Sequence, residues 1–206
     1  MPPIFTVGHS NHPLPHFLQL LQQHQITALG DIRSTPAGRF SPQFDRESLR
    51  EALRAHGIRY VYLGDELGGR PSNPYCWIYG RVSYQRMAST AMFRHGLNRV
   101  RTGTRSLRIA LMCSEKDPVE CHRGLLIGRC LSAANTDVRH ILASGEIESQ
   151  ADMLARLKQI LNLSAPSLFD AADALADRAY LLQEERIAYR RHHAEVESPL
   201  ENQRQR

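Results

Sequence analysis

Apolar and polar stretches alternate along this chain in a regular order. Short apolar runs bounded by turn residues predict buried strands, and longer stretches with apolar residues three or four positions apart predict helices. The expected strands are residues 4–7, 27–32, 58–63, 107–113 and 138–142. The expected helices are residues 13–25, 45–56, 84–101, 120–134, 149–163 and 168–191. This alternation predicts an α/β fold, with a mainly parallel sheet of about five strands, helices on both faces, and additional C-terminal helices.

The pattern divides the chain into three parts. Residues 1–145 are expected to form an α/β domain that carries the candidate site, and residues 146–192 a helical extension packed on it. Residues 193–206 are expected to form a polar, flexible tail. The connection at residues 64–82 is unusually long for a loop without function. Its aromatic and basic side chains indicate either a lid over a pocket or a surface that stacks unpaired nucleobases.

Polar residues follow several of the expected strands. The carboxyl ends of parallel strands lie at one edge of the sheet, where ligands of α/β proteins usually bind. We therefore expect side chains that are far apart in sequence to line one pocket at this edge. The residues expected there are Gly8, His9, Ser10, Asp31, Arg33, Cys113, Glu115, Cys121, His122 and Arg123.

Two cysteines of this set are candidate nucleophiles. Cys121 is expected in the first turn of the 120–134 helix, where free N–H groups and the helix dipole favour anions and lower the pKa of a thiol. Cys113, at the end of a strand, is the second candidate, although it could instead pack as a small apolar residue. His9 is the candidate acid or base, and Glu115, also a catalytic candidate, or Ser10 could set its tautomer.

The other polar residues at this edge favour an anionic ligand. Guanidinium groups bind phosphate or carboxylate through paired hydrogen bonds. The expected anion-binding residues are Arg33, Arg123, His122, Gly8, Ser10 and Asp31. Structural roles are the alternative for some of them. Asp31 and Arg33 could form an ion pair, and Ser10 could cap the helix at residues 13–25.

The same segment supports a second interpretation, a site for zinc or another transition metal. Such ions prefer thiolates and imidazoles, and Cys113, Cys121 and His122, together with His9, supply them. The spacing departs from the Cys-x5-Arg loop of cysteine phosphatases, because Arg123 lies ten residues after Cys113 and two after Cys121. Two classes of function stay open: an enzyme acting on a phosphate-bearing or nucleotide-like substrate, and a non-catalytic module that binds nucleic acid or a metal. No cofactor is identified.

Four motifs in the chain resemble a known family. They are Thr6-Val-Gly-His-Ser10, Asp31-Ile-Arg33-Ser-x-Pro36, Leu67-Gly-Gly69 and Cys113-x-Glu115-x5-Cys121-His-Arg123. In this order, over roughly residues 4–142, they resemble domain of unknown function 488. The resemblance implies a compact cytoplasmic α/β protein of prokaryotic type whose shared polar motifs line one pocket. It implies no particular activity.

Composition leaves the nature of the partner open. The formal net charge is +5 and the isoelectric point about 9.3, and of 26 basic residues only Lys116 and Lys158 are lysines. Arginine suits bidentate capture of phosphate, but a base-composition bias of the genome would also replace lysine by arginine. An anionic small molecule and nucleic acid are both compatible with this charge.

Cysteine usage and hydropathy exclude other classes of protein. Cys76, Cys113, Cys121 and Cys130 form no disulfide-scaffold pattern, so we expect reduced thiols and a cytoplasmic protein. No apolar run approaches the roughly 20 residues of a membrane-spanning helix, and the N-terminal residues lack the layout of a signal peptide. We expect no membrane partner, whereas the surface helix at 168–191 is compatible with a homodimer.

Overall fold

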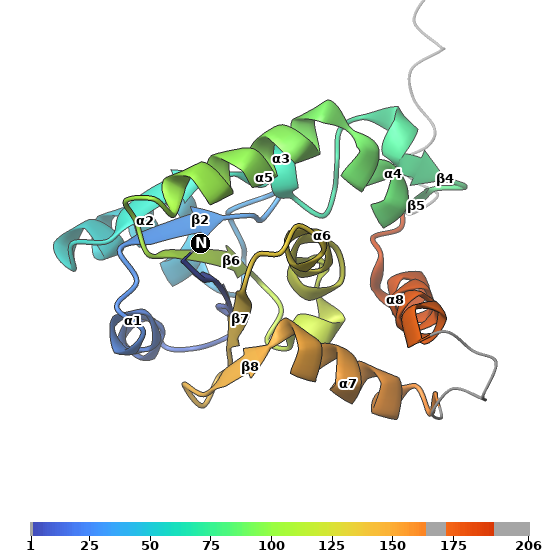
Figure 1. The fold of residues 1–206 in the computed structure, drawn as a ribbon. Coiled ribbons are helices and arrows are strands. Elements are labelled where there is room, and N and C mark those ends of the chain that lie inside the picture. The colour runs from blue at the N-terminus through green and yellow to red at the C-terminus, as the bar shows by residue number, and fades with distance from the viewer. Residues whose placement is uncertain (1, 164–171, 192–206) are drawn as a thin grey trace, which may run out of the picture.

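The computed structural model describes residues 2–163 and 172–191 (Figure 1). In this part of the chain, six strands form one sheet in the order β3-β2-β6-β1-β7-β8. Their bounds are β1 Ile4–Gly8, β2 Ala28–Asp31, β3 Arg59–Tyr62, β6 Ile109–Cys113, β7 Val138–Ile141 and β8 Ile147–Ser149. The first five of these are parallel to one another, and β8 runs antiparallel to β7. The predicted α/β class with a mainly parallel sheet is confirmed.

Helices connect the strands and cover both faces of the sheet. The α-helices are α1 Leu14–Gln23, α2 Arg46–Ala55, α3 Gly64–Leu67, α4 Tyr84–Ser89, α5 Ala91–Gly103, α6 Arg129–Ala133, α7 Gln150–Ile160 and α8 Ala172–Ile187. The other helical segments are the 3-10 turns η1 Pro42–Phe44, η2 Pro74–Cys76 and η3 Pro118–Glu120, and the π-helical segment η4 Arg123–Gly128. No helix within the described residues is long and apolar enough to cross a membrane.

Two apolar cores lie on opposite faces of the sheet because successive side chains of a strand point in opposite directions. In β6, Ala110 and Met112 belong to the core under α1 and α2. Leu111 and Cys113 belong to the larger core, which α5, η4, α7 and α8 cover. This alternation places the thiol of Cys113 on the face that also receives Cys121.

Several expected elements differ in detail from those observed. The expected helix at 84–101 is broken at Thr90, whose hydroxyl accepts a hydrogen bond from the Phe93 N–H and begins α5. The connection at 64–82 contains α3, η2 and a short hairpin, β4 Trp77–Ile78 with β5 Arg81–Val82. The sequence did not indicate β8, which has three residues and a partly exposed surface, too short for a clear alternation.

The C-terminal part contributes two helices that pack together. α7 follows β8 directly, and α8 packs on α7 and on η4. The start of the expected 168–191 helix and the expected tail at 193–206 lie outside the described residues. After α8 the chain turns back to the β4–β5 hairpin, where the Arg191 N–H donates to the Gly80 carbonyl.

Candidate functional site

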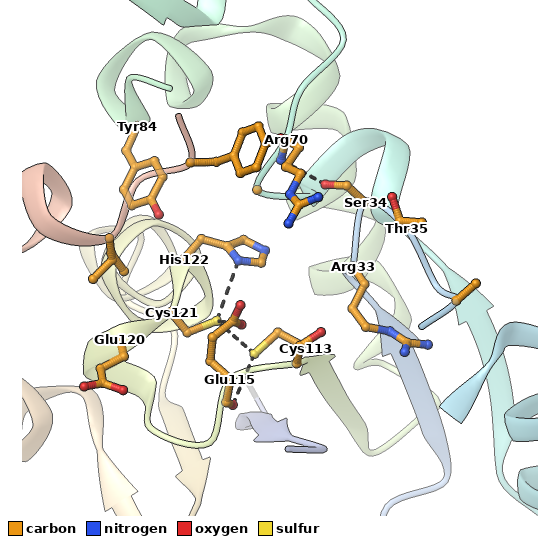
Figure 2. Close-up of a pocket in the computed structure, with 15 residues that line it drawn as sticks. Arg33, Ser34, Thr35, Arg70, Tyr84, Cys113, Glu115, Glu120, Cys121 and His122 are labelled. Atoms are coloured by element: carbon orange, nitrogen blue, oxygen red, sulfur yellow. Dashed lines mark hydrogen bonds between the residues drawn. The ribbon is translucent and has the colours of Figure 1, made fainter. Parts of the chain in front are cut away.

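A pocket of about 440 Å³ opens at the carboxyl edge of the sheet, beside the ends of β2 and β6 (Figure 2). Five of the predicted site residues line it: Arg33, Cys113, Glu115, Cys121 and His122. The other five, Gly8, His9, Ser10, Asp31 and Arg123, do not line it. Residues that were not predicted as site residues complete the wall, among them Ser34, Arg70, Tyr84, Ser114, Glu120, Ile187 and Tyr189.

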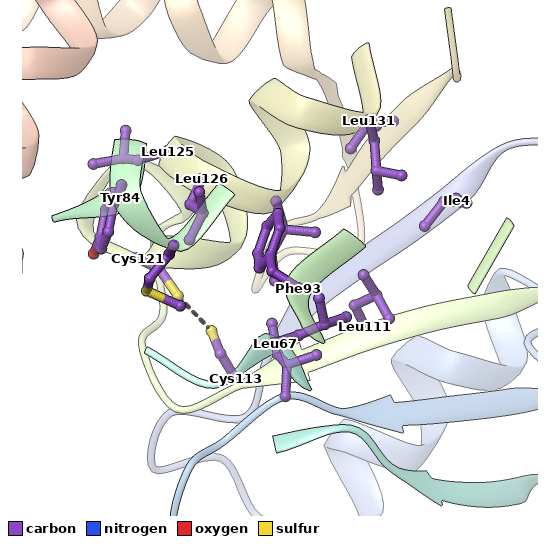
Figure 3. Packing of buried hydrophobic residues seen from close by; sticks show 14 of the residues in the cluster. Ile4, Leu67, Tyr84, Phe93, Leu111, Cys113, Cys121, Leu125, Leu126 and Leu131 are labelled. Atoms are coloured by element: carbon purple, nitrogen blue, oxygen red, sulfur yellow. Dashed lines mark hydrogen bonds between the residues drawn. The ribbon is translucent and has the colours of Figure 1, made fainter. Parts of the chain in front are cut away.

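Two free thiols meet at the floor of the pocket. The sulfurs of Cys113 and Cys121 are 2.8 Å apart, and each residue is 1% exposed. The Cys121 thiol also lies 3.0 Å from Oε2 of Glu115. Figure 3 shows both cysteines at the end of the larger apolar core, near Leu67 and Leu126. The thiol pair is therefore shielded by the core on one side and faces the pocket on the other.

A buried guanidinium lies behind this pair. Arg123 is fully buried, and its Nη1 donates to the sulfur of Cys113 at 2.8 Å. The same side chain donates to the carbonyls of Glu115 and Lys116. Burial acts to lower the pKa of Arg123, but the interactions with Cys113 and Cys121 outweigh it and raise that pKa. A buried cation requires a compensating partner, so this contact stabilises negative charge on the Cys113 sulfur.

Gly8 makes room for this contact. A Cβ at position 8 would collide with the carbonyl of Glu115 and would lie 2.8 Å from Nη1 of Arg123. The glycine thus allows two strand ends and a buried side chain to approach one another, and the group that approaches it is the protein's own backbone.

Cys121 differs from the expected thiol at a helix N-terminus. It ends the 3-10 turn η3 in an extended conformation, with φ −138°, and η4 begins two residues later. Burial, followed by the neighbouring Cys113, raises the pKa of Cys121 well above its ordinary value. Cys121 is therefore a neutral thiol. For Glu115, burial acts to raise the pKa, but the hydrogen bond from Cys121 and the nearby His122 outweigh it, so the carboxyl pKa is lowered.

His122 packs beside the thiols. Its Nδ1 lies 3.6 Å from the sulfur of Cys121, and its Nε2 is buried without a hydrogen-bond partner among the described residues. Burial lowers its pKa, so the ring is neutral at neutral pH. A Cβ on Gly69 would lie 3.2 Å from this ring, so a side chain at position 69 would make a tight contact with it.

Asp31 and Arg33 form a buried ion pair. Nη2 of Arg33 donates to Oδ2 of Asp31 at 2.7 Å and Nε donates to Oδ1 at 2.9 Å. Tyr60 donates its hydroxyl to the same carboxylate at 2.7 Å. The carboxylate thus neutralises Arg33, whose guanidinium points away from the thiols in Figure 2.

His9 contacts the Asp31–Arg33 pair from outside the pocket. Nε2 of His9 lies 3.3 Å from Nη1 of Arg33, and the ring stacks on Phe44. Burial, followed by the charge of Arg33, lowers the pKa of His9 to about 4. Ser10 has φ 47° and donates its hydroxyl to Asn11. The expected capping hydrogen bond from Ser10 is not observed, because α1 begins after Pro13 without a side-chain cap.

The rim of the pocket comes from segments that are distant in the chain. The Arg70 guanidinium lies 4.2 Å from the ring of Tyr189, and the Arg70 N–H donates to the hydroxyl of Ser34. Tyr84 begins α4 and points its hydroxyl into the pocket (Figure 2). The position of Ser34 next to Arg33 in the second motif was a usable signal. No local signal marked Tyr189, because it reaches the pocket only through the packing of α8.

The thiols and Glu115 are the residues best placed to hold a metal. One ligand atom from each of Cys113, Glu115 and Cys121 lies within 4.8 Å of the others. Two thiolates on one tetrahedral zinc, at about 2.3 Å each, would be about 3.8 Å apart. The sulfurs at 2.8 Å would have to separate to bind one ion in this way. The donor set fits zinc in chemistry, whereas its present spacing does not.

Comparison with known proteins identifies the family. Residues 13–130, more than half of the chain, match the model of a family described as "Domain of unknown function DUF488". Searches of curated proteins and of solved structures returned no match. The matched region includes β2, β3 and β6 and the segment from Cys113 to Arg123. The chain therefore belongs to the DUF488 family.

Proposed function

We propose that this protein is an enzyme that binds a phosphate-bearing substrate in the pocket and attacks it with the thiolate of Cys113. The contact between Nη1 of Arg123 and the sulfur of Cys113 carries the proposal. A guanidinium without exposure to water is held against a sulfur that faces the pocket. Such a contact favours the thiolate, which is the nucleophilic form of cysteine.

The neighbouring groups suit a covalent mechanism. The Cys113 sulfur would form a bond to an electrophilic centre of the substrate as the bond to the leaving group breaks and that group departs with its electron pair. Water would then hydrolyse the adduct and restore the thiolate. Glu115 lies in the same pocket and can act as a base toward this water.

Arg70 is the cation that we assign to substrate binding. Arg33 also lines the pocket, but Asp31 neutralises its charge. Arg70 is exposed at the rim and its guanidinium rests on an aromatic ring, which leaves its N–H groups toward the opening. A pocket of about 440 Å³ is in the range that encloses a small organic ligand, so a nucleotide-sized substrate fits better than a polymer.

Alkylation of the thiols tests the proposal. The reduced protein is treated with iodoacetamide at pH 7, with and without inorganic phosphate, against chloride of equal ionic strength. Trypsin places Cys113 in the peptide 109–116, Cys121 in 117–123 and Cys130 in 130–139, so each rate is measured separately. We expect Cys113 to react about tenfold faster than free cysteine, of which only a few per cent is thiolate near pH 7, and phosphate to slow it. If Cys113 reacts no faster than free cysteine and phosphate has no effect, the proposal fails.

A second candidate function is non-catalytic binding of a thiophilic metal. It rests on the cluster of Cys113, Glu115 and Cys121. Metal analysis of protein purified without chelator tests it directly. Stoichiometric zinc lost in the Cys121→Ser variant but kept in Cys130→Ser would favour this function over the enzyme.

A further inference from the structure

The Cys113–Cys121 pair has a geometry that the proposed nucleophilic role of Cys113 leaves unexplained. The nucleophile needs one thiol, yet a second lies 2.8 Å away. A disulfide bond is about 2.05 Å long, so the two sulfurs would need to approach by roughly 0.8 Å to form one. The residues are eight positions apart in the chain, which makes closure of the loop between them inexpensive. The other two cysteines lie in different elements from this pair, Cys76 in η2 and Cys130 in α6.

We propose that Cys113 and Cys121 form a reversible intramolecular disulfide, in which Cys121 attacks and resolves an oxidised Cys113. The inference rests on the proposed function in one respect: it takes Cys113 as the reactive thiolate. It adds a modification site at the same pocket and a role for Cys121. The disulfide would occupy the nucleophile, so the oxidised protein would be inactive.

The oxidant is a small hydroperoxide that enters the pocket. The thiolate of Cys113 attacks the terminal hydroxyl oxygen of the peroxide; an S–O bond forms, the O–O bond breaks, and the leaving oxygen takes a proton from solvent to become water or an alcohol. Cys121 then attacks the Cys113 sulfur; the S–S bond forms, the S–O bond breaks, and hydroxide leaves as water with the proton of Cys121. The two sulfurs together lose two electrons and the peroxide gains them. An external dithiol restores both thiols by exchange.

The contacts of each sulfur fit its role, with Cys113 as the thiol that is oxidised first and Cys121 as the thiol that resolves it. Arg123 contacts Cys113, which makes Cys113 the sulfur that reacts first. Glu115 contacts Cys121 through Oε2 at 3.0 Å, so a carboxylate is in place to pass the proton of Cys121 to the leaving hydroxide. Both thiols line the pocket, so a small oxidant has access to them although the core shields their other side.

Peroxide oxidation followed by tryptic peptide mapping tests the inference. The full chain, reduced and freed of metal with chelator, is titrated with hydrogen peroxide and digested without reductant. Because the two cysteines fall in the peptides 109–116 and 117–123, a disulfide joins these peptides with the loss of two hydrogen atoms. We expect this linked pair as the main product, its loss after dithiothreitol, and the same result for the Cys130→Ser control.

The Cys121→Ser variant removes the resolving thiol. In it we expect Cys113 to proceed to the irreversible sulfinic acid about tenfold faster or more than in the wild type. If this variant does not fold, the time course of the wild type decides, because the disulfide must appear before any sulfinic acid at Cys113. Sulfinic acid at Cys113 without prior linkage, or linkage through Cys76 or Cys130, overturns the inference. Phosphate-protected alkylation of reduced Cys113 would then still support the proposed function, so the two failures are distinguishable.

Discussion

Replacement of Gly8 by alanine tests the link between close packing and the reactivity of the site. A Cβ at this position would overlap the carbonyl of Glu115 and would lie 2.8 Å from Nη1 of Arg123. Neither group can yield easily, since one is backbone and the other is fully buried. The shift that the Cβ forces on these groups should lengthen or break the hydrogen bond from Arg123 to the sulfur of Cys113.

The magnitude follows from the overlap. Overpacking of a well-packed interior costs about 1–3 kcal/mol, and each kcal/mol lowers Tm by about 2–4 °C in a chain of this size. We also expect the alkylation rate of Cys113 to fall toward that of free cysteine, because its thiolate loses the buried cation. Gly38→Ala is the matched control, because a Cβ there would meet no atom of residues 2–163 and 172–191 within 4 Å.

Thermal unfolding and peptide-resolved alkylation of the two variants are the assays. Gly8→Ala should change both readouts and Gly38→Ala neither. An unchanged Tm would refute the packing argument. A lowered Tm with wild-type reactivity of Cys113 would refute the assignment of Arg123 as the group that activates this thiol.

Three further predictions concern the rim and the buried network. Arg70→Ala should remove most of the protection that phosphate gives Cys113 against alkylation, without lowering Tm. Arg59 is an exposed arginine of β3, and the control Arg59→Ala should keep this protection. Equal protection in both variants would contradict the role of Arg70 in phosphate binding. The pKa of His9 is lowered from 6.5 to about 4, so the unfolded chain binds the proton first as pH falls. Stability from this group is present above pH 6.5 and is lost between pH 6.5 and 4, by about 3 kcal/mol in total. In urea unfolding, the free energy of unfolding should therefore fall less between pH 6.5 and 4 in His9→Gln than in the wild type or in His56→Gln. If the free energy falls equally with pH in all three proteins, His9 is not the group responsible. Tyr60→Phe removes a hydroxyl donor to the buried Asp31 carboxylate and should cost about 1.5–3 kcal/mol in urea unfolding; a cost near zero would mean that this hydrogen bond is not formed in solution.

The local pattern of apolar and polar residues determined the fold class and indicated where the candidate site lies. Apolar runs marked the parallel strands most clearly in β1 and β6, where every residue is buried, because burial on both faces leaves a strand almost without polar residues. The polar residues after β2 and β6 marked the edge at which the pocket opens, since parallel strands all end there. Arg33, Cys113, Glu115, Cys121 and His122 were found in this way.

The tertiary structure decided what each of these residues contacts. Arg123 follows Cys121 and His122 in sequence and was expected to bind a ligand, but η4 turns it into the core beneath Cys113. The 2.8 Å contact of the two thiols and the position of Tyr189 at the rim likewise arise from packing of η4 and α8 on the sheet. Sequence periodicity reports which positions are buried, because burial repeats with the period of a helix or strand. The partner that a buried polar group meets depends on elements that are distant in the chain, so only the folded structure supplies it.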